Sequence, residues 1–65
     1  MREISRTEYE NIISEWVHSE RDRKIIRRKI LDGITFEQLA EESDLSVSQV
    51  KRIVYHTKEI IMNHI

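Results

Sequence analysis

Polar side chains suited to chemistry are concentrated in one segment, SVSQVKRIVYH, which covers residues 46–56. Ser48 and Gln49 offer hydroxyl and amide groups, while Lys51 and Arg52 offer cations that pair with phosphate or carboxylate oxygens. The guanidinium of Arg52 can also donate two parallel hydrogen bonds to the O6 and N7 atoms of a guanine. The segment therefore indicates recognition of a polar, anionic surface rather than bond-breaking chemistry.

Catalytic and metal-binding patterns find little support in the sequence. Only one glycine is present, Gly33, so no glycine-rich phosphate loop is expected, and the absence of cysteine removes thiolate zinc sites. His18, His56 and His64 lack the spacing of metal ligands. No nucleophile stands in a recognisable pattern with a base and an orienting acid. We therefore expect a protein that is not an enzyme and needs no metal or cofactor.

Residues 47–62 have the periodicity of an amphipathic helix with one packed face and one outward face. At about 100° per residue, one sector holds Val50, Ile53, Val54, Thr57 and Ile61. The opposite sector holds Ser48, Arg52, Tyr55, His56 and Glu59, with Gln49 and Lys51 on its flanks. We expect the first face to enter a core and the second to meet a partner.

The remaining sequence predicts three further helices, over residues 6–17, 20–32 and 36–42. Ser5, Ser19, Thr35 and Ser46 precede the four helices at positions where a hydroxyl caps free amides. Apolar residues recur at helical spacing in the first helix, and we expect Trp16 on that stripe to lie in the core. The expected fold is all-α, a single domain over residues 1–65 built as a small bundle of about four helices.

Residues 36–53 have the layout of a helix-turn-helix. The small Ala40 lets a second helix cross closely, and Asp44 suits a tight connection because aspartate tolerates left-handed backbone better than most residues. We expect Leu45 to fill the corner and Val50 to seat the second helix on the first. Such a unit places the N-terminal part of its second helix in the major groove of DNA.

Residues 20–53 resemble the C-terminal promoter-reading domain of bacterial sigma factors, known as region 4. The matching motifs follow an arginine-rich helix and are DGIT at 32–35, EQLA at 37–40, DLS at 44–46 and VKRI at 50–53. The resemblance implies binding to double-stranded DNA, with the helix that starts after Ser46 as reading helix. We expect a small stand-alone regulator of the phage or mobile-element kind, because 65 residues cannot hold the promoter-melting domain of a complete sigma factor.

This sequence departs from the family where bases are read. Primary family members carry arginine and glutamate directly after the cap, where this chain has Val47 and Ser48. The usual upstream promoter hexamer is therefore not implied. The candidate DNA-binding residues are Thr35, Ser46, Val47, Ser48, Gln49, Lys51, Arg52, Tyr55 and His56.

These candidates have expected roles and plainer alternatives. Arg52 is the first choice for a base contact, with Ser48 and Gln49 nearby, and Lys51 is expected at phosphate. Val47 could touch a thymine methyl or form an edge of the core. Tyr55 and His56 lie further along and could reach phosphate or sugar. Alternatively, the hydroxyls of Thr35 and Ser46 are helix caps alone, and the other polar residues are solvated helix surface.

Cations of the expected second helix form another candidate patch, for phosphate or protein: Arg21, Lys24 and Arg28, together with Arg27 and Lys29. The alternative is a solvated helix face with salt bridges to Glu20 and Asp32. The net charge of −1 hides segregated blocks, with six Lys/Arg against two Asp at 21–33 and four acids without a base at 34–45.

The acidic block supports an alternative class of function. Glu37, Glu41 and Glu42 lie opposite the apolar positions of their helix, so we expect most of them to face solvent. They could contact a basic protein surface, as in a protein-interaction module that docks on RNA polymerase or another regulator. A third alternative is the DNA-recognition component of a phage packaging or recombination machine.

The apolar C-terminal tail, residues 60–65, could pack against the first helix or bury itself in a second protomer. A two-fold homodimer would present two reading helices about 34 Å apart. No apolar run approaches the roughly 20 residues of a membrane span, and residues 1–10 lack the apolar core of a signal peptide. With no cysteine, a cytoplasmic protein without a membrane partner is expected.

Overall fold

The fold is all-α, as the sequence predicts. The computed structural model describes residues 4–64, which form four helices and no strand within that range. The helices are α1 (Arg6–Trp16), α2 (Glu20–Ile30), α3 (Phe36–Ser43) and α4 (Val47–Met62). In this part of the chain no helix is both long and apolar enough to cross a membrane.

All four helices begin where a side-chain hydroxyl caps them. Ser5, Ser19, Thr35 and Ser46 each accept a hydrogen bond from the amide three residues later, at 3.1–3.4 Å. At the last two caps the bond is reciprocated, because Gln38 accepts from the Thr35 amide at 3.1 Å and Gln49 accepts from the Ser46 amide at 2.9 Å. These reciprocal bonds satisfy amides that a helix start leaves without partners, so the starts of α3 and α4 are firmly defined.

The helix ends differ slightly from the prediction. α2 ends at Ile30 rather than residue 32, because the chain turns over the next residues and reaches the left-handed region at Gly33, with φ 69°. α1 ends at Trp16, and Arg23 of α2 donates hydrogen bonds to the Ser14 and Val17 carbonyls beside that end. These carbonyl contacts tie the start of α2 to the end of α1.

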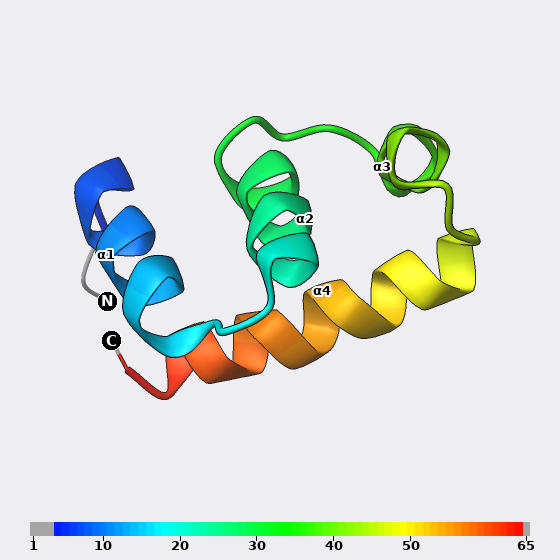
Figure 1. Ribbon diagram of the computed structural model, residues 1–65. Coiled ribbons are helices and arrows are strands. Elements are labelled where there is room, and N and C mark those ends of the chain that lie inside the picture. The colour runs from blue at the N-terminus through cyan, green and yellow to red at the C-terminus, as the bar shows by residue number, and fades with distance from the viewer. Residues whose placement is uncertain (1–3, 65) are drawn as a thin grey trace.

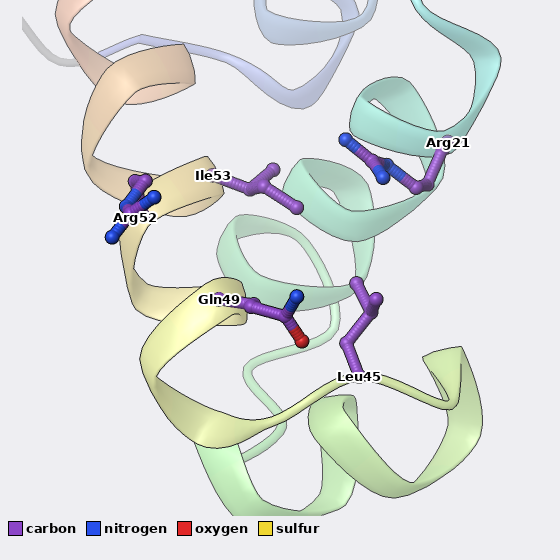
Figure 2. Close-up of a pocket in the computed structure, with 5 residues that line it drawn as sticks. All are labelled: Arg21, Leu45, Gln49, Arg52 and Ile53. Atoms are coloured by element: carbon purple, nitrogen blue, oxygen red, sulfur yellow. The ribbon is translucent and has the colours of Figure 1, made fainter.

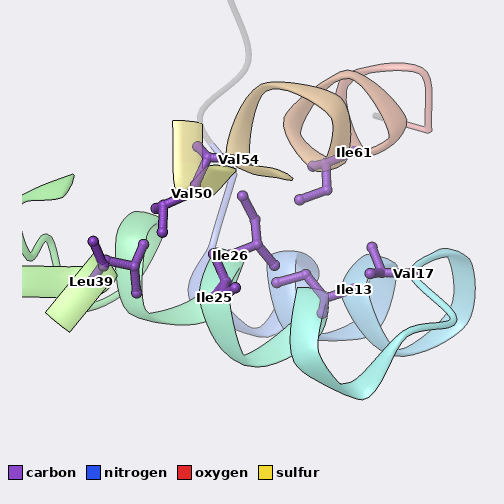
Figure 3. Packing of buried hydrophobic residues seen from close by; sticks show 9 residues of the cluster. Ile13, Val17, Ile25, Ile26, Leu39, Val50, Val54 and Ile61 are labelled. Atoms are coloured by element: carbon purple, nitrogen blue, oxygen red, sulfur yellow. The ribbon is translucent and has the colours of Figure 1, made fainter. Parts of the chain in front are cut away.

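α4 is the element on which the other three helices pack. It runs along the length of the molecule beneath α1 and α2, while α3 is seen nearly end-on above its first turns (Figure 1). All four helices send apolar side chains into one core, most of which Figure 3 displays. Its buried members are Ile13, Val17, Ile25, Ile26, Leu39, Ala40, Val50, Val54 and Ile61. Each large side chain of this kind stabilises the fold by roughly 1.5–3 kcal/mol before entropy costs.

The packed face predicted for α4 is confirmed. Val50, Val54, Thr57 and Ile61 are buried, and Ile53 is half-buried against the same core. The C-terminal tail therefore packs within its own chain as far as Ile61, whereas Ile65 lies outside the described residues.

The prediction that Trp16 lies in the core is wrong. Its side chain is 43% exposed, and Val17 takes the buried position instead. Ile13 and Val17 are four residues apart and so share one line of the helical stripe, which leaves Trp16 at its edge. There the indole stacks on His64, with ring centroids 3.8 Å apart and planes 6° from parallel. The ring thus covers the end of α4 rather than filling the interior.

Candidate functional site

The connection between α3 and α4 is a tight, hydrogen-bonded turn. Asp44 adopts left-handed backbone with φ 56°, as its position in the sequence predicts. The Leu45 amide donates to the Ala40 carbonyl at 3.1 Å, and the Asp44 amide donates to the Glu41 carbonyl at 3.4 Å. This pair of bonds is the Schellman arrangement, which closes a helix end and fixes the direction of the following chain. Leu45 is half-buried against the core, so the turn is anchored by packing as well.

This turn presents the first half of α4 with its polar side outward. Ser48, Arg52 and Tyr55 are exposed, Tyr55 to 60%, and the core-facing Val50 holds the helix down. Lys51 and His56 are exposed as well. The expected division of α4 into a packed and an outward face is therefore present in the structure. Together the outward side chains offer hydroxyl, guanidinium, ammonium and phenol groups on one surface.

Four of the candidate residues are engaged in building the fold. The hydroxyls of Thr35 and Ser46 cap α3 and α4, and the Gln49 side-chain oxygen accepts from the Ser46 amide. The Gln49 amide nitrogen keeps its two donors. Val47 is half-buried and packs against the core. The hydrogen-bonding capacity of this helix start is therefore concentrated on Ser48, Lys51, Arg52 and the amide nitrogen of Gln49.

The candidate patch on α2 does not form one free cationic surface. Arg28 donates to Glu42 of α3 through two bonds of 2.9 Å and to Asp32 through a third of 2.9 Å. Arg21 lies 3.3 Å from its neighbour Asp22. Arg28 is therefore held in ion pairs that join α2 to α3 and to the turn after α2, which agrees with the alternative of a salt-bridged helix face for this residue.

Two other arginines are also paired with carboxylates. Arg27 contacts Glu10 of α1 at 3.0 Å, and Arg6 lies 3.6 Å from Asp32. Within residues 4–64, the cations without a carboxylate at ion-pair distance are Arg23, Lys24, Lys29, Lys51, Arg52 and Lys58. Arg23 is occupied by backbone carbonyls, so uncompensated charge rests mainly on the lysines and on Arg52. The alternative pairing of α2 cations with Asp32 is present for Arg28, whereas no described cation of α2 lies at ion-pair distance from Glu20.

Pairing also changes the electrostatics of the acidic helix. Hydrogen bonds from Arg28, aided by its charge, hold the pKa of the Glu42 carboxyl below its ordinary value, and the same contacts raise the pKa of Arg28. Glu42 is consequently compensated, while Glu37 and Glu41 are exposed on α3 as expected. Only these last two leave uncompensated negative charge on α3.

A shallow cavity of about 170 Å³ lies between α2 and the first half of α4. Figure 2 shows Arg21 and Gln49 reaching into this space from opposite sides, with Leu45 and Ile53 as apolar lining. Arg52 borders the cavity, but its guanidinium turns away from Ile53 toward the outer side of α4 (Figure 2). The Arg52 side chain is thus free to meet a partner outside the cavity.

A cluster that the sequence analysis did not single out surrounds Phe36, the first residue of α3. Lys29 lies with its Nζ atom 4.3 Å from the Phe36 ring centroid, and the Nζ atom of Lys51 lies 5.6 Å from it. Tyr55 meets the same ring edge-on at 6.1 Å. No periodicity within a single helix signals this cluster, because its members come from three helices.

No family model, curated protein or solved structure matches this chain.

Proposed function

We propose that this protein binds double-stranded DNA through a helix-turn-helix formed by α3, the turn at Asp44 and α4, and that it regulates transcription. The proposal retains the resemblance to region 4 of sigma factors. The observation that carries it is the outward polar face of α4, on which Arg52 has no carboxylate at ion-pair distance within residues 4–64 and follows a helix start fixed by a capped turn. A helix about 10–12 Å across fits the B-DNA major groove, which is about 12 Å wide.

In this proposal base reading and affinity belong to different side chains. Arg52 donates to a guanine edge, with the Ser48 hydroxyl and the Gln49 amide nitrogen as additional readers. Lys51 contacts phosphate, and Tyr55 and His56 lie further along α4, within reach of the sugar–phosphate backbone. The arginines that ion pairs already occupy contribute little, so affinity depends on a small number of lysine contacts.

The test is a selection from random-sequence duplexes at low salt, followed by titration of the selected site. Arg52→Ala should remove about 1–3 kcal/mol of discrimination between the selected and a scrambled duplex, while scrambled-duplex binding changes less. Arg6→Ala is the charge-matched control, because it removes a cation from α1, far along the molecule from the first turns of α4 (Figure 1). If no duplex binds at low salt, the DNA-binding proposal is wrong.

A second candidate function is docking on RNA polymerase or another regulator through α3. The observation that favours it is the exposure of Glu37 and Glu41, which lack an ion-pair partner within residues 4–64. Purified polymerase should then bind the wild type more tightly than the Glu37→Gln/Glu41→Gln double variant, with DNA binding unchanged or improved. Equal polymerase binding by the two proteins would exclude this surface.

A further inference from the structure

Three helices bring two lysines to one aromatic ring. Lys29 comes from α2, Phe36 opens α3, and Lys51 and Tyr55 come from α4; we refer to these four residues as the Phe36 cluster. The Lys29 ammonium also donates to the Ile34 carbonyl at 3.0 Å, which holds it on this side of the molecule. An ammonium has three donors, so Lys29 keeps two for a ligand.

The cluster carries positive charge that the protein itself leaves uncompensated. Neither Lys29 nor Lys51 has a carboxylate at ion-pair distance in the part of the chain that the structure describes. Arg27 and Arg28, the two residues before Lys29, are both paired with carboxylates. Because like charges gathered in one place repel, an anion with several acceptor oxygens would lower the electrostatic energy of the cluster.

The position of the cluster relative to the outward face of α4 indicates which anion this is. Lys51 precedes Arg52, and Tyr55 lies one turn beyond Lys51, so the cluster borders the face that carries Ser48 and Arg52. A duplex that receives this face in its major groove has a phosphate backbone on each side of α4. The cluster lies where one of the two backbones would pass.

We propose that the Phe36 cluster is a DNA-backbone site, in which Lys29 and Lys51 bind phosphates of one strand and the Tyr55 hydroxyl is a further donor. The Phe36 ring orients both ammonium groups through cation–π contact. This inference rests on the proposed DNA-binding function. It adds residues of α2 and α3, Lys29 and Phe36, to an interface otherwise confined mainly to α4.

Salt titration of DNA binding tests the site, with the selected duplex and a scrambled duplex as probes. Lys29→Ala and Lys51→Ala should each reduce the slope of log K against log salt by roughly one, and the double variant by roughly two. Both duplexes should weaken by the same factor, because phosphates carry no sequence information. Arg52→Ala should instead change the ratio between the two duplexes.

Two further variants separate the site from general effects of charge and folding. Arg6→Ala removes one cation away from the cluster and should leave the slope within about 0.3 of the wild type. Phe36→Leu keeps an apolar residue but removes the ring, so it should weaken binding to both duplexes. Its salt slope should stay closer to that of the wild type than the slopes of the two lysine variants do. Circular dichroism of each variant checks that the four helices are retained.

The outcomes distinguish this inference from the function on which it rests. If the wild type binds no duplex at low salt, both fail. If the wild type binds and Arg52→Ala lowers specificity, but the Lys29→Ala/Lys51→Ala double variant keeps the wild-type slope, the inference alone is overturned. A polyglutamate peptide is the probe for the alternative ligand, an acidic protein segment. If the double variant loses peptide binding but keeps the wild-type salt slope for DNA, the Phe36 cluster binds acidic protein segments instead of DNA.

Discussion

Arg28 and Glu42 form a bidentate ion pair that joins α2 to the last turn of α3, with two nitrogen–oxygen distances of 2.9 Å. Two parallel bonds fix the angle between guanidinium and carboxylate, which a single contact does not. Glu42 lies two residues before Asp44, where the chain turns into α4. The pair therefore helps to determine how the turn and the outward face of α4 are presented.

Acid should weaken this connection. The pKa of Glu42 is lowered in the folded protein by the Arg28 hydrogen bonds, so the carboxylate contributes stability that is fully present above its ordinary pKa. That contribution is lost as pH falls through the lowered folded value. We expect wild type to exceed Glu42→Gln in unfolding free energy at about pH 6, and the difference to shrink by about pH 3. Urea titrations of both proteins over this pH range measure the difference in unfolding free energy.

Glu41→Gln is the matched control for this prediction. Glu41 is the adjacent residue of the same helix, is exposed, and has no ion-pair partner within residues 4–64. The difference in unfolding free energy between wild type and Glu41→Gln should vary less with pH than the difference between wild type and Glu42→Gln. If the two variants follow the same pH profile, the Arg28–Glu42 pair does not contribute specifically to stability.

The turn at Asp44 should be improved by glycine and damaged by a β-branched residue. Left-handed backbone costs an L-residue about 1–2 kcal/mol, which glycine avoids, although glycine loses about 0.5–1 kcal/mol more in chain entropy on folding. Asp44→Gly also removes a negative charge from a helix C-terminus, where it is unfavourable. We expect Asp44→Gly to match or exceed the wild-type unfolding free energy by up to about 1 kcal/mol, and Asp44→Val to fall below it.

The unfolding free energies of Asp44→Gly and Asp44→Val are measured by urea titration with circular dichroism as the signal. Asp44→Asn is the intermediate case, because asparagine enters left-handed backbone more readily than valine and carries no charge. We expect the unfolding free energy to be highest for Asp44→Gly, lower for Asp44→Asn and lowest for Asp44→Val. A valine variant as stable as the glycine variant would contradict the left-handed geometry.

Thr57 is a buried polar side chain in the packed face of α4. It is 1% exposed, and its hydroxyl has no hydrogen-bond partner within residues 4–64. A buried hydroxyl without a partner costs about 1–3 kcal/mol, so Thr57→Val, which keeps the branched shape, should stabilise the protein by roughly 1 kcal/mol. Thr57→Ser keeps the hydroxyl and removes a methyl, and should be less stable than wild type. Thermal unfolding compares the three proteins, and a destabilised valine variant would indicate that the hydroxyl is satisfied in solution.

The sequence was sufficient for features that depend on neighbouring residues. Ser46 and Gln49 are three residues apart and form the predicted cap, and the alternation of Val50, Val54 and Arg52 around one helix predicted which residues are buried and which are exposed. Local spacing determines both, because a regular helix fixes the relative directions of its own side chains.

Features that join distant residues could not be predicted in this way. Arg28 meets Glu42 across 14 positions, and the spacing within α2 alone could not distinguish this pair from a solvated surface. The same limit explains the missed contact of Lys29 with Phe36 and the wrong prediction for Trp16, because the apolar stripe of α1 does not reveal that the chain returns with His64. The α2 cations were predicted as a group, but carboxylates on α1 and α3 pair with Arg27 and Arg28 and so decide which of these cations remain available.

The stack of Trp16 on His64 should report directly on the end of α4, because the protein has only one tryptophan. His64→Ala removes a parallel ring at 3.8 Å and uncovers an indole that is already 43% exposed. Fluorescence emission should therefore shift to longer wavelength and become more accessible to acrylamide, and the unfolding free energy should fall by about 0.5–1.5 kcal/mol. His18→Ala is the control, since it removes a histidine two residues from Trp16 in sequence without touching the stack. If His64→Ala and His18→Ala have the same emission wavelength and the same acrylamide quenching, His64 does not stack on Trp16 in solution.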